Sequence, residues 1–443
     1  MKLEKMYALG RRAGVLLGAL ACCLSAAAGE YVWTGAVDGC WTNAANWTVG
    51  GVVATQPPGQ IDLSDGIVGG SLGDSAVFSG TSDNTTVDLD GLHSIKDVTV
   101  TGASTPAYTF GTSSSQILHL ETDSTILVDS SVTAMPLFPC GIGIATDGNK
   151  SNPTIQNDAA QTLVLNKVGY VTGASSWLET LLTLAGTGTI RLAGTLTDMS
   201  LWQLKPTFKA SRVIVAANWT SLHGLVLATP TVGTVELENG AVVAMGDSWC
   251  TLSVSYDTQI IGNGTVRMAS HNRGGSAGWW DGDINIAGAR TLTLGENVTL
   301  ANARDESAWR GGVRRTNGGT LVINGPNTMP GLVQLHNGTT RVSSIAQLGG
   351  TAVGHDKIVV QGGARLVYAG AGETVTRMVV MTNGAAIVEQ AGTGSLVVNS
   401  AMQTLSGKTG RLTLVNNSSA AATWNGVIPA TVTGVTVDRK SVV

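Results

Sequence analysis

The stretch Gly318–Gly350, GGTLVINGPNTMPGLVQLHNGTTRVSSIAQLGG, decides the fold of this chain. It contains short strand-type runs, each followed by residues that favour turns. The runs are Thr320–Ile323, Leu332–Leu335 and Thr339–Val342, and the turns fall at Gly325–Asn327 and Asn337–Gly338. Four-residue strands divided at close intervals by Gly, Pro and Asn are typical of the successive coils of a β-solenoid.

This stretch resembles the autotransporter-associated β-strand repeat. That pattern is roughly a Gly-Thr-Leu strand, a Gly-x-Asn-Thr turn, a further Gly, a second strand into a Gly-rich turn, and a closing Leu-Gly. The matching positions here are Gly319, Thr320, Leu321, Gly325, Asn327, Thr328, Gly331, Gly338, Thr339, Val342, Leu348 and Gly349, and Met329 stands where the family usually has an aromatic residue. The resemblance is strong from about Gly288 to Gly426 and implies an exported β-solenoid, but it names no chemistry.

The rest of the chain favours the same all-β fold class. Only 13% of the residues are charged and 58 are glycine, so strand- and turn-forming residues make up the chain rather than helix-forming Glu, Lys and Arg. Short strand-type runs recur from Thr85 onward, and several alternate polar with apolar residues. Alternation fits a sandwich or a β-helix, but the regular turns favour a right-handed parallel β-helix (solenoid) over residues 85–437. We expect Leu321 and Val359 to point into its core.

One segment interrupts the strand-and-turn pattern. Pro136–Cys140 carries two prolines within five residues, and residues 141–154 continue the interruption with glycine and polar side chains. We therefore expect the two segments to form a loop that protrudes from the solenoid.

Residues 1–28 have the features of a signal peptide. Basic residues between Lys2 and Arg12 precede an apolar run, Ala13–Leu24, and Ala26–Ala28 supplies the small side chains that a signal peptidase accepts. We expect cleavage after Ala28, so that the mature chain begins at Gly29, is exported, and is extracellular or associated with the outer-membrane cell surface. The residues before Cys22 and Cys23 fit a lipid anchor poorly. The apolar run is shorter than the ~20 residues of a membrane span, and we expect no span in the mature chain.

Residues 29–84 form a Trp-rich segment of their own. Trp33, Trp41 and Trp47 lie close together, and the segment resembles the N-terminal module of exported β-repeat proteins, with its Trp-Thr-Gly, Trp-x-x-x-x-Asn-Trp and Gly-Asp-x-Ala-x-Phe elements. We expect the indoles to cap the open first coil of the solenoid. The alternative is a sugar-stacking platform, which would need exposed rings. Trp279 and Trp280, beside the Gly-rich residues 271–278, are a second candidate platform.

The sequence predicts no catalytic, cofactor-binding or metal site. The six histidines are scattered without metal-ligand spacing, and Asp88–Gly91 is only a fragment of a calcium turn. The nearest local carboxylate pairs are Glu236/Glu238, Asp281/Asp283 and Asp305/Glu306. Alternation on a strand would place Glu236 and Glu238 on one face, and a solvated face is the favoured interpretation there over glycosidase chemistry. In the mature chain Cys40, Cys140 and Cys250 allow at most one disulfide, and we expect three buried or partly buried thiols in separate coils.

The function expected from these features is structural or adhesive rather than enzymatic. A net charge of −4 and a single short basic run, residues 310–315, do not favour nucleic-acid binding. The expected partners are extracellular polysaccharides or host and cell-surface ligands. The alternative is a β-helix enzyme or binding protein that acts on polysaccharides. Residues 438–443, DRKSVV, depart from the repeat pattern and are typical of a sequencing artefact or a truncated end, so the anchor cannot be identified from the sequence.

Overall fold

A computed structural model gives the fold of this protein. It describes residues 28–59, 73–90, 93–144, 152–170, 180–197, 204–222, 224–245, 251–268, 282–302, 313–328, 333–349, 357–382, 384–405 and 407–439. The regular elements in these ranges are β-strands, apart from two short 3-10 helices, η1 (Ala44–Asn46) and η2 (Ile345–Leu348). None of the helices in the described part is long and apolar enough to cross a membrane.

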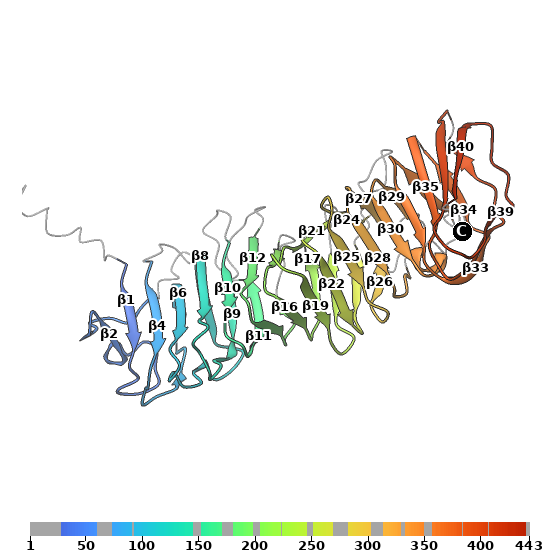
Figure 1. Ribbon diagram of the computed structural model, residues 1–443. Coiled ribbons are helices and arrows are strands. Elements are labelled where there is room, and N and C mark those ends of the chain that lie inside the picture. Colours follow the sequence, from blue (N-terminus) through green and yellow to red (C-terminus); the bar gives the residue numbers. More distant parts are fainter. Residues whose placement is uncertain are drawn as a thin grey trace, which may run out of the picture.

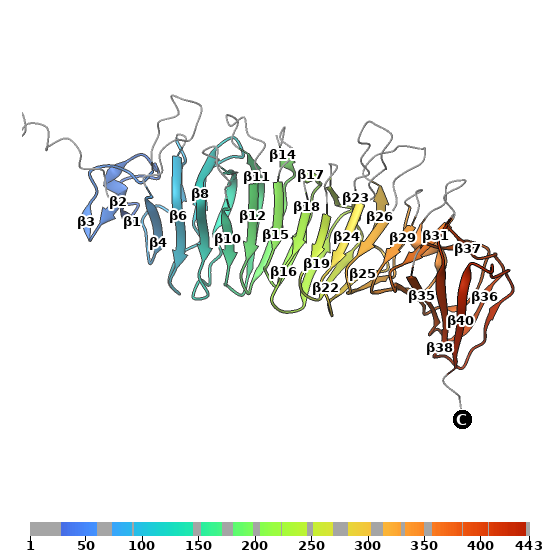
Figure 2. The same cartoon turned by 90° about the horizontal axis from the view of Figure 1, so that it is seen from above.

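The strands stack in parallel along an elongated body that runs from the N-terminal to the C-terminal coils (Figure 1; Figure 2). The first ladder is formed by β1 (Glu30–Trp33), β4 (Ser75–Ser79), β6 (His93–Thr101), β8 (Ile117–Val128), β10 (Thr154–Asn157), β12 (Thr180–Ala185), β15 (Leu204–Phe208), β18 (Gly224–Leu227), β21 (Thr251–Val254), β24 (Gly282–Ile286), β27 (Val313–Thr316), β29 (Val333–His336), β31 (Lys357–Gln361), β34 (Met378–Met381) and β37 (Gln403–Thr404).

A second parallel ladder runs beside the first. It is formed by β5 (Thr86–Val87), β7 (Thr109–Phe110), β9 (Leu137–Ile144), β11 (Thr162–Tyr170), β13 (Thr189–Leu192), β16 (Arg212–Val215), β19 (Gly233–Leu237), β22 (Thr258–Gly262), β25 (Thr291–Leu294), β28 (Thr320–Ile323), β30 (Thr339–Val342), β32 (Arg365–Tyr368), β35 (Gly384–Gln390), β38 (Gly410–Asn416) and β40 (Val432–Arg439). The chain passes from the first ladder to the second in each coil, so both ladders lengthen together.

A third set of parallel strands completes the coils. Its members are β14 (Leu196–Thr197), β17 (Trp219–Leu222), β20 (Val242–Met245), β23 (Thr265–Met268), β26 (Thr299–Asn302), β33 (Ala371–Val375), β36 (Gly394–Val398) and β39 (Ala422–Trp424). In the early coils the third strand position is occupied by the first residues of β8 and the last residues of β9 and β11, which pair with one another in parallel. The parallel β-solenoid predicted from the sequence is therefore confirmed.

The N-terminal end differs from the other coils. β2 (Trp47–Val49) and β3 (Val52–Val53) pair antiparallel in the order β1–β2–β3, the only antiparallel pairing among the described strands. β1 also pairs in parallel with β4, so the hairpin is joined directly to the first ladder. The free edge of the ladder is thereby covered by two short strands that turn back on themselves, which blunts it against pairing with other chains.

Alternation of side chains builds the core. In β13, β25 and β28 every second residue is buried, as the sequence pattern predicts for a strand with one wet and one apolar face. Parallel register places inward-facing residues in continuous columns; one runs through Ile190, Val213, Val235, Ile260, Leu294, Ile323, Val342 and Tyr368. Each buried aliphatic side chain contributes roughly 1.5–3 kcal/mol, so many different sequences can satisfy the same fold.

The expected protruding loop at Pro136–Cys140 is wrong. Leu137–Ile144 forms β9, and the side chains of Phe138 and Cys140 are buried. The Phe138 ring stacks on Phe110 of the preceding coil with 4.7 Å between ring centroids. The register against β11 shifts just after Phe138, and this irregularity accommodates Pro139, which has no N–H to give to the ladder. Of residues 141–154, those from 145 to 151 lie outside the described residues.

The two inward-facing assignments have different outcomes. Leu321 is 1% exposed and belongs to the apolar core, as predicted. In β31, Ile358 and Val360 belong to the apolar cluster. Val359 is also buried, at 5% exposed, but it lies outside that cluster, in register with Gln334 of β29 on the other face of the ladder. Ile358, Val359 and Val360 are all apolar, so the sequence does not show which of them face inward. A shift of one residue moves every side chain of a strand to the opposite face.

Candidate functional site

The N-terminal indoles form a packed cluster. Trp33, Trp41 and Trp47 are each at most 1% exposed. The Trp47 ring lies 4.9 Å from Trp33 and 4.8 Å from Trp41 between centroids, both edge-on, and Phe78 of β4 packs against all three. Their Nε1 atoms donate to the carbonyls of Asn84, Pro58 and Trp41 at 3.0, 2.9 and 2.9 Å. The rings are covered, so they close the end of the solenoid as predicted and do not form a sugar-stacking platform.

An amide and carboxylate network holds the loop that carries Trp41. Asn46 is fully buried, and its side-chain carbonyl accepts from the N–H groups of Val37 and Asp38 at 3.0 and 3.1 Å. The Asp38 carboxylate accepts from the Asn43 and Asn46 amides at 2.8 and 2.6 Å, and these bonds hold the pKa of Asp38 below its usual value. The spacing of Asp and Asn around Trp41 therefore serves to build the cap.

Asp88 and Asp90 fasten the cap to the next coils. Asp88 accepts a hydrogen bond from the Gln116 side chain, and Asp90 accepts from both the backbone N–H and the hydroxyl of Thr42. Cys40 pairs with Asp88 through a parallel bridge. In the described part of the chain, no group of three or more His, Cys, Asp or Glu side chains is arranged to hold a metal ion. Gly91, the last residue of the calcium-like fragment, lies outside the described residues.

Cys40 and Cys140 are both free thiols. Cys140 of β9 is buried, and desolvation raises the pKa of its thiol to about 12. Cys40 is half-buried, and desolvation, followed by the charge of Asp38, raises its pKa above the usual value. A raised pKa favours the protonated thiol, which is a weaker nucleophile than the thiolate. Cys250 lies outside the described residues.

Glu236 of β19 and Glu238, which directly follows the strand, lie on its wet face as alternation predicts, but each is engaged by an arginine. Glu238 accepts from the Arg191 guanidinium at 2.8 Å, and Glu236 forms an ion pair with Arg212. The four side chains retain 23–47% of their exposure and sit on the outer surface of β13, β16 and β19. Two carboxylates fixed by guanidinium groups are ill suited to exchange protons with a sugar, so this cluster is better explained as surface ion pairing.

Removing one of these carboxylates should therefore have a small effect. We expect Glu238→Gln to lower the free energy of unfolding by less than about 1 kcal/mol, because the pair is partly exposed and screened by solvent. Glu236→Gln serves as the matched variant on the same strand. Urea unfolding followed by circular dichroism measures both. A loss above about 2 kcal/mol would contradict the assignment of these residues to an ordinary solvated face.

The other predicted positions fall largely outside the described residues. Asp283 lies on β24, whereas its partner Asp281 is not described. The second candidate platform, Trp279 and Trp280 with residues 271–278, also lies outside the described residues, as do Asp305 and Glu306.

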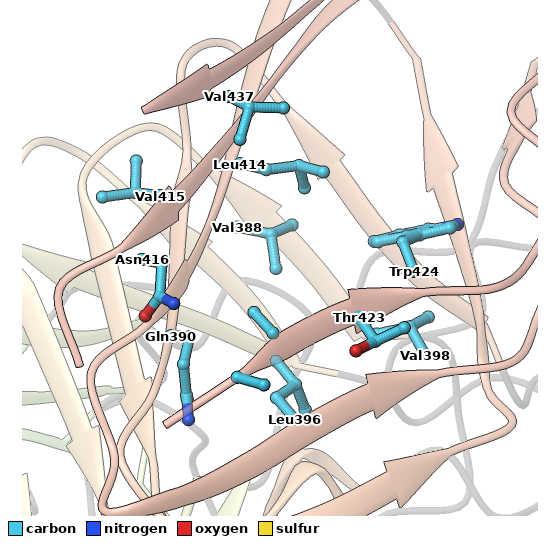
Figure 3. Close-up of a pocket in the computed structure, with 12 residues that line it drawn as sticks. Val388, Gln390, Leu396, Val398, Leu414, Val415, Asn416, Thr423, Trp424 and Val437 are labelled. Carbon is cyan, nitrogen blue, oxygen red and sulfur yellow. The ribbon is translucent and has the colours of Figure 1, made fainter. Parts of the chain in front are cut away.

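The C-terminal end contains an apolar cavity of about 450 Å³ that the sequence did not predict (Figure 3). Val388, Leu414 and Val437 form one wall as a continuous column of β35, β38 and β40, and Trp424 of β39 faces them. Val437 belongs to an inward-facing column yet is 58% exposed, so the core is open here. The one feature of the sequence that could have indicated this cavity is Trp424, which lies far from the other tryptophans in the sequence. The other described tryptophans, Trp33, Trp41, Trp47 and Trp219, are core residues.

Trp424 differs from the other described indoles. Trp33, Trp41, Trp47 and Trp219 donate their Nε1–H to backbone carbonyls, whereas the Nε1 atom of Trp424 is buried without a hydrogen-bond partner. Two of the polar side chains that line the cavity are already engaged: Gln390 donates to the carbonyl of Gly394, and Asn416 donates to that of Ala420 at 3.1 Å. The cavity is thus lined mainly by apolar side chains, and the nitrogen end of the Trp424 indole points away from Val388 and Leu414 (Figure 3).

Comparisons with known proteins give no further assignment. No protein-family model matches the chain, and searches of curated proteins and of solved structures found no match either. What the protein does must therefore be inferred from its own fold and surface.

Proposed function

We propose that this protein is an exported, non-enzymatic β-solenoid that acts as a rigid stalk or adhesive surface on a Gram-negative-type bacterium. The observation that carries the proposal is the continuity of the parallel ladders from β1 to β40 (Figure 1). Each added coil lengthens such a body by about 4.8 Å without changing its cross-section. A body of this kind is suited to holding a surface at a distance from its point of attachment.

Two further features support export. Residues 1–28 have the charge and hydropathy pattern of a signal peptide, and the fold begins just after them, at Glu30. The repeat resemblance from Gly288 to Gly426 points to the same address, because that repeat is typical of exported passenger proteins. Extracellular polysaccharides or host and cell-surface ligands are the partners that an adhesive role would require.

The non-enzymatic role is supported by how the described acids are used. Glu236, Glu238 and Glu389 are paired with arginines, and Asp38 and Asp97 accept hydrogen bonds from neighbouring amides and hydroxyls. Each of these carboxylates stabilises a turn, a ladder or an ion pair. Groups that are engaged in this way serve the fold, and catalysis would require them to give up those partners.

The proposal can be tested with the full chain expressed with its own leader in a Gram-negative host. We expect the protein in the outer-membrane or extracellular fraction, and we expect the purified mature chain to release no reducing ends from a panel of polysaccharides. Retention of the chain in the cytoplasm would overturn the export proposal. Bond cleavage by the mature chain would overturn the non-enzymatic role.

Polysaccharide binding is a second candidate, which the C-terminal cavity favours. A space of about 450 Å³ beside Trp424 is in the size range of small-ligand sites, and an indole provides a face on which a sugar ring can stack. Retention on a polysaccharide column that Trp424→Ala abolishes and Trp219→Phe preserves would favour this candidate. Equal retention of both variants would exclude the cavity as the binding site.

A further inference from the structure

Asp74 is a buried carboxylate beside the first residue of the expected mature chain. It is 3% exposed, and its Oδ1 atom accepts a hydrogen bond from the backbone nitrogen of Gly29 at 3.0 Å. Its Oδ2 atom accepts from the backbone nitrogen of Gly59 at 3.1 Å. These two neutral N–H groups are the partners that the described part of the chain supplies. Neither of these donors carries a positive charge, so among the described residues no cation is paired with the Asp74 carboxylate.

We propose that signal-peptide cleavage between Ala28 and Gly29 creates an α-ammonium group that forms an ion pair with Asp74 and locks the N-terminal cap. This inference rests on the export part of the proposed function. Water hydrolyses the Ala28–Gly29 peptide bond under catalysis by a signal peptidase: the carbonyl carbon of Ala28 takes the hydroxyl and leaves as a carboxylate. The Gly29 nitrogen takes protons and becomes an ammonium group at the position where an amide now contacts Asp74.

The surroundings of Gly29 suit a new chain end. Ala28 is exposed, so cutting before Gly29 removes nothing from the core. The carbonyl of Gly29 accepts from the Ser75 N–H at 2.9 Å, which fixes the residue against β4 independently of its nitrogen. A Cβ atom at position 29 would lie 2.7 Å from the Tyr31 ring, so glycine is the residue that brings its nitrogen to Asp74 without displacing that ring.

The other charged side chains on the adjoining strands either have hydrogen-bond partners or are exposed to solvent. Lys96 of β6, whose backbone N–H donates to the Asp74 carbonyl at 2.9 Å, donates its ammonium group to the carbonyl of Thr122 at 2.6 Å. Asp97 accepts from the Ser75 hydroxyl at 3.2 Å and from the Thr125 N–H at 2.9 Å. Glu30 on β1 is exposed to solvent. Asp74 is therefore the buried acid that the new ammonium group would meet.

The pH dependence has a defined sign. An ammonium group that gains a carboxylate partner has a higher pKa in the folded than in the unfolded chain, where an α-amino group titrates near ~8. The stabilisation is then fully present below about pH 8 and is lost as the pH rises through the folded-state pKa. An acetylated Gly29, which carries no charge, should lack this alkaline transition.

The test compares three forms of the full mature chain: a free Gly29 terminus, an Nα-acetylated Gly29 terminus, and a terminus extended by Ala27–Ala28. At pH 7 we expect the amides of β1 and β4 to exchange hydrogen about tenfold more slowly in the free Gly29 form than in the other two. The difference should disappear in Asp74→Asn and should fade above about pH 9. Equal exchange in the three forms, or a difference that persists in Asp74→Asn, would overturn the ion pair.

The comparison of the three termini needs no substitution, so it remains decisive even where Asp74→Asn fails to fold. The terminus of the exported protein is determined separately by mass spectrometry, and we expect it to be Gly29. A different terminus would contradict the expected processing site, whereas the exchange experiment on the prepared Gly29 form reports on the ion pair alone. The two parts of the inference can therefore fail independently.

Discussion

Replacing Leu321 with aspartate is expected to lower the free energy of unfolding by several kcal/mol. Leu321 is 1% exposed, and in the core it stands in register between Leu292 of β25 and Thr340 of β30. The substitution removes a buried aliphatic side chain and places an unpaired charge in an apolar column. The Thr340 hydroxyl is the one polar side-chain group among these two register neighbours, and a single hydroxyl cannot balance a carboxylate.

The neighbouring position supplies the control. Val322 lies on the opposite face of β28 and is partly exposed. We expect Val322→Asp to cost less than about 1 kcal/mol, because its carboxylate can remain hydrated. Thermal and urea unfolding followed by circular dichroism measures both variants. Similar losses for the two substitutions would show that the inward and outward faces of β28 are assigned incorrectly.

The sequence predicts the fold best where strands are short and alternate. Thr320–Ile323 and Thr339–Val342 were predicted with the bounds that β28 and β30 have. The turn between them was predicted at Asn337–Gly338, and both residues have positive φ angles of 54° and 52°. Asn and Gly tolerate this left-handed conformation better than other residues. Local patterning therefore carries most of the information about a coil.

Prediction fails where a strand bends or carries a proline. β8 runs without a break from Ile117 to Val128, across the polar residues around Asp123. Asp123 has a φ of 54°, and this single left-handed residue turns the strand from one ladder into another. In β9 the ladder absorbs Pro139 at a shift of register, which only pairing with β11 reveals.

The features of the two ends depend on contacts that are distant in sequence. The Trp-rich motif predicts that Trp33, Trp41 and Trp47 are buried, but it does not predict that Asp74 approaches Gly29 across 45 positions. The cavity at Trp424 likewise depends on how β35, β38, β39 and β40 stack on one another. A sequence pattern indicates the local conformation that a residue prefers, whereas these two sites depend on which strands lie next to one another when the coils stack.

Replacing Trp47 with alanine is expected to loosen the whole N-terminal cap. Trp47 is fully buried, lies between Trp33 and Trp41, and donates its Nε1–H to the carbonyl of Trp41 at 2.9 Å. Its removal opens a large cavity at the point where the β1–β2–β3 hairpin joins the first ladder, and a buried Trp→Ala substitution costs about 3–5 kcal/mol. Loss of the edge-on ring contacts adds to that cost.

The effect should be local, because each coil of a solenoid contacts only its neighbours. Amide hydrogen exchange should therefore accelerate in β1, β2 and β4 of Trp47→Ala while that of β28 stays unchanged. Trp47→Phe is the matched variant: it keeps a ring in the cluster and should show a smaller acceleration. Uniform acceleration along the chain would mean that the coils unfold as one cooperative unit, and no acceleration would mean that Trp47 does not hold the cap.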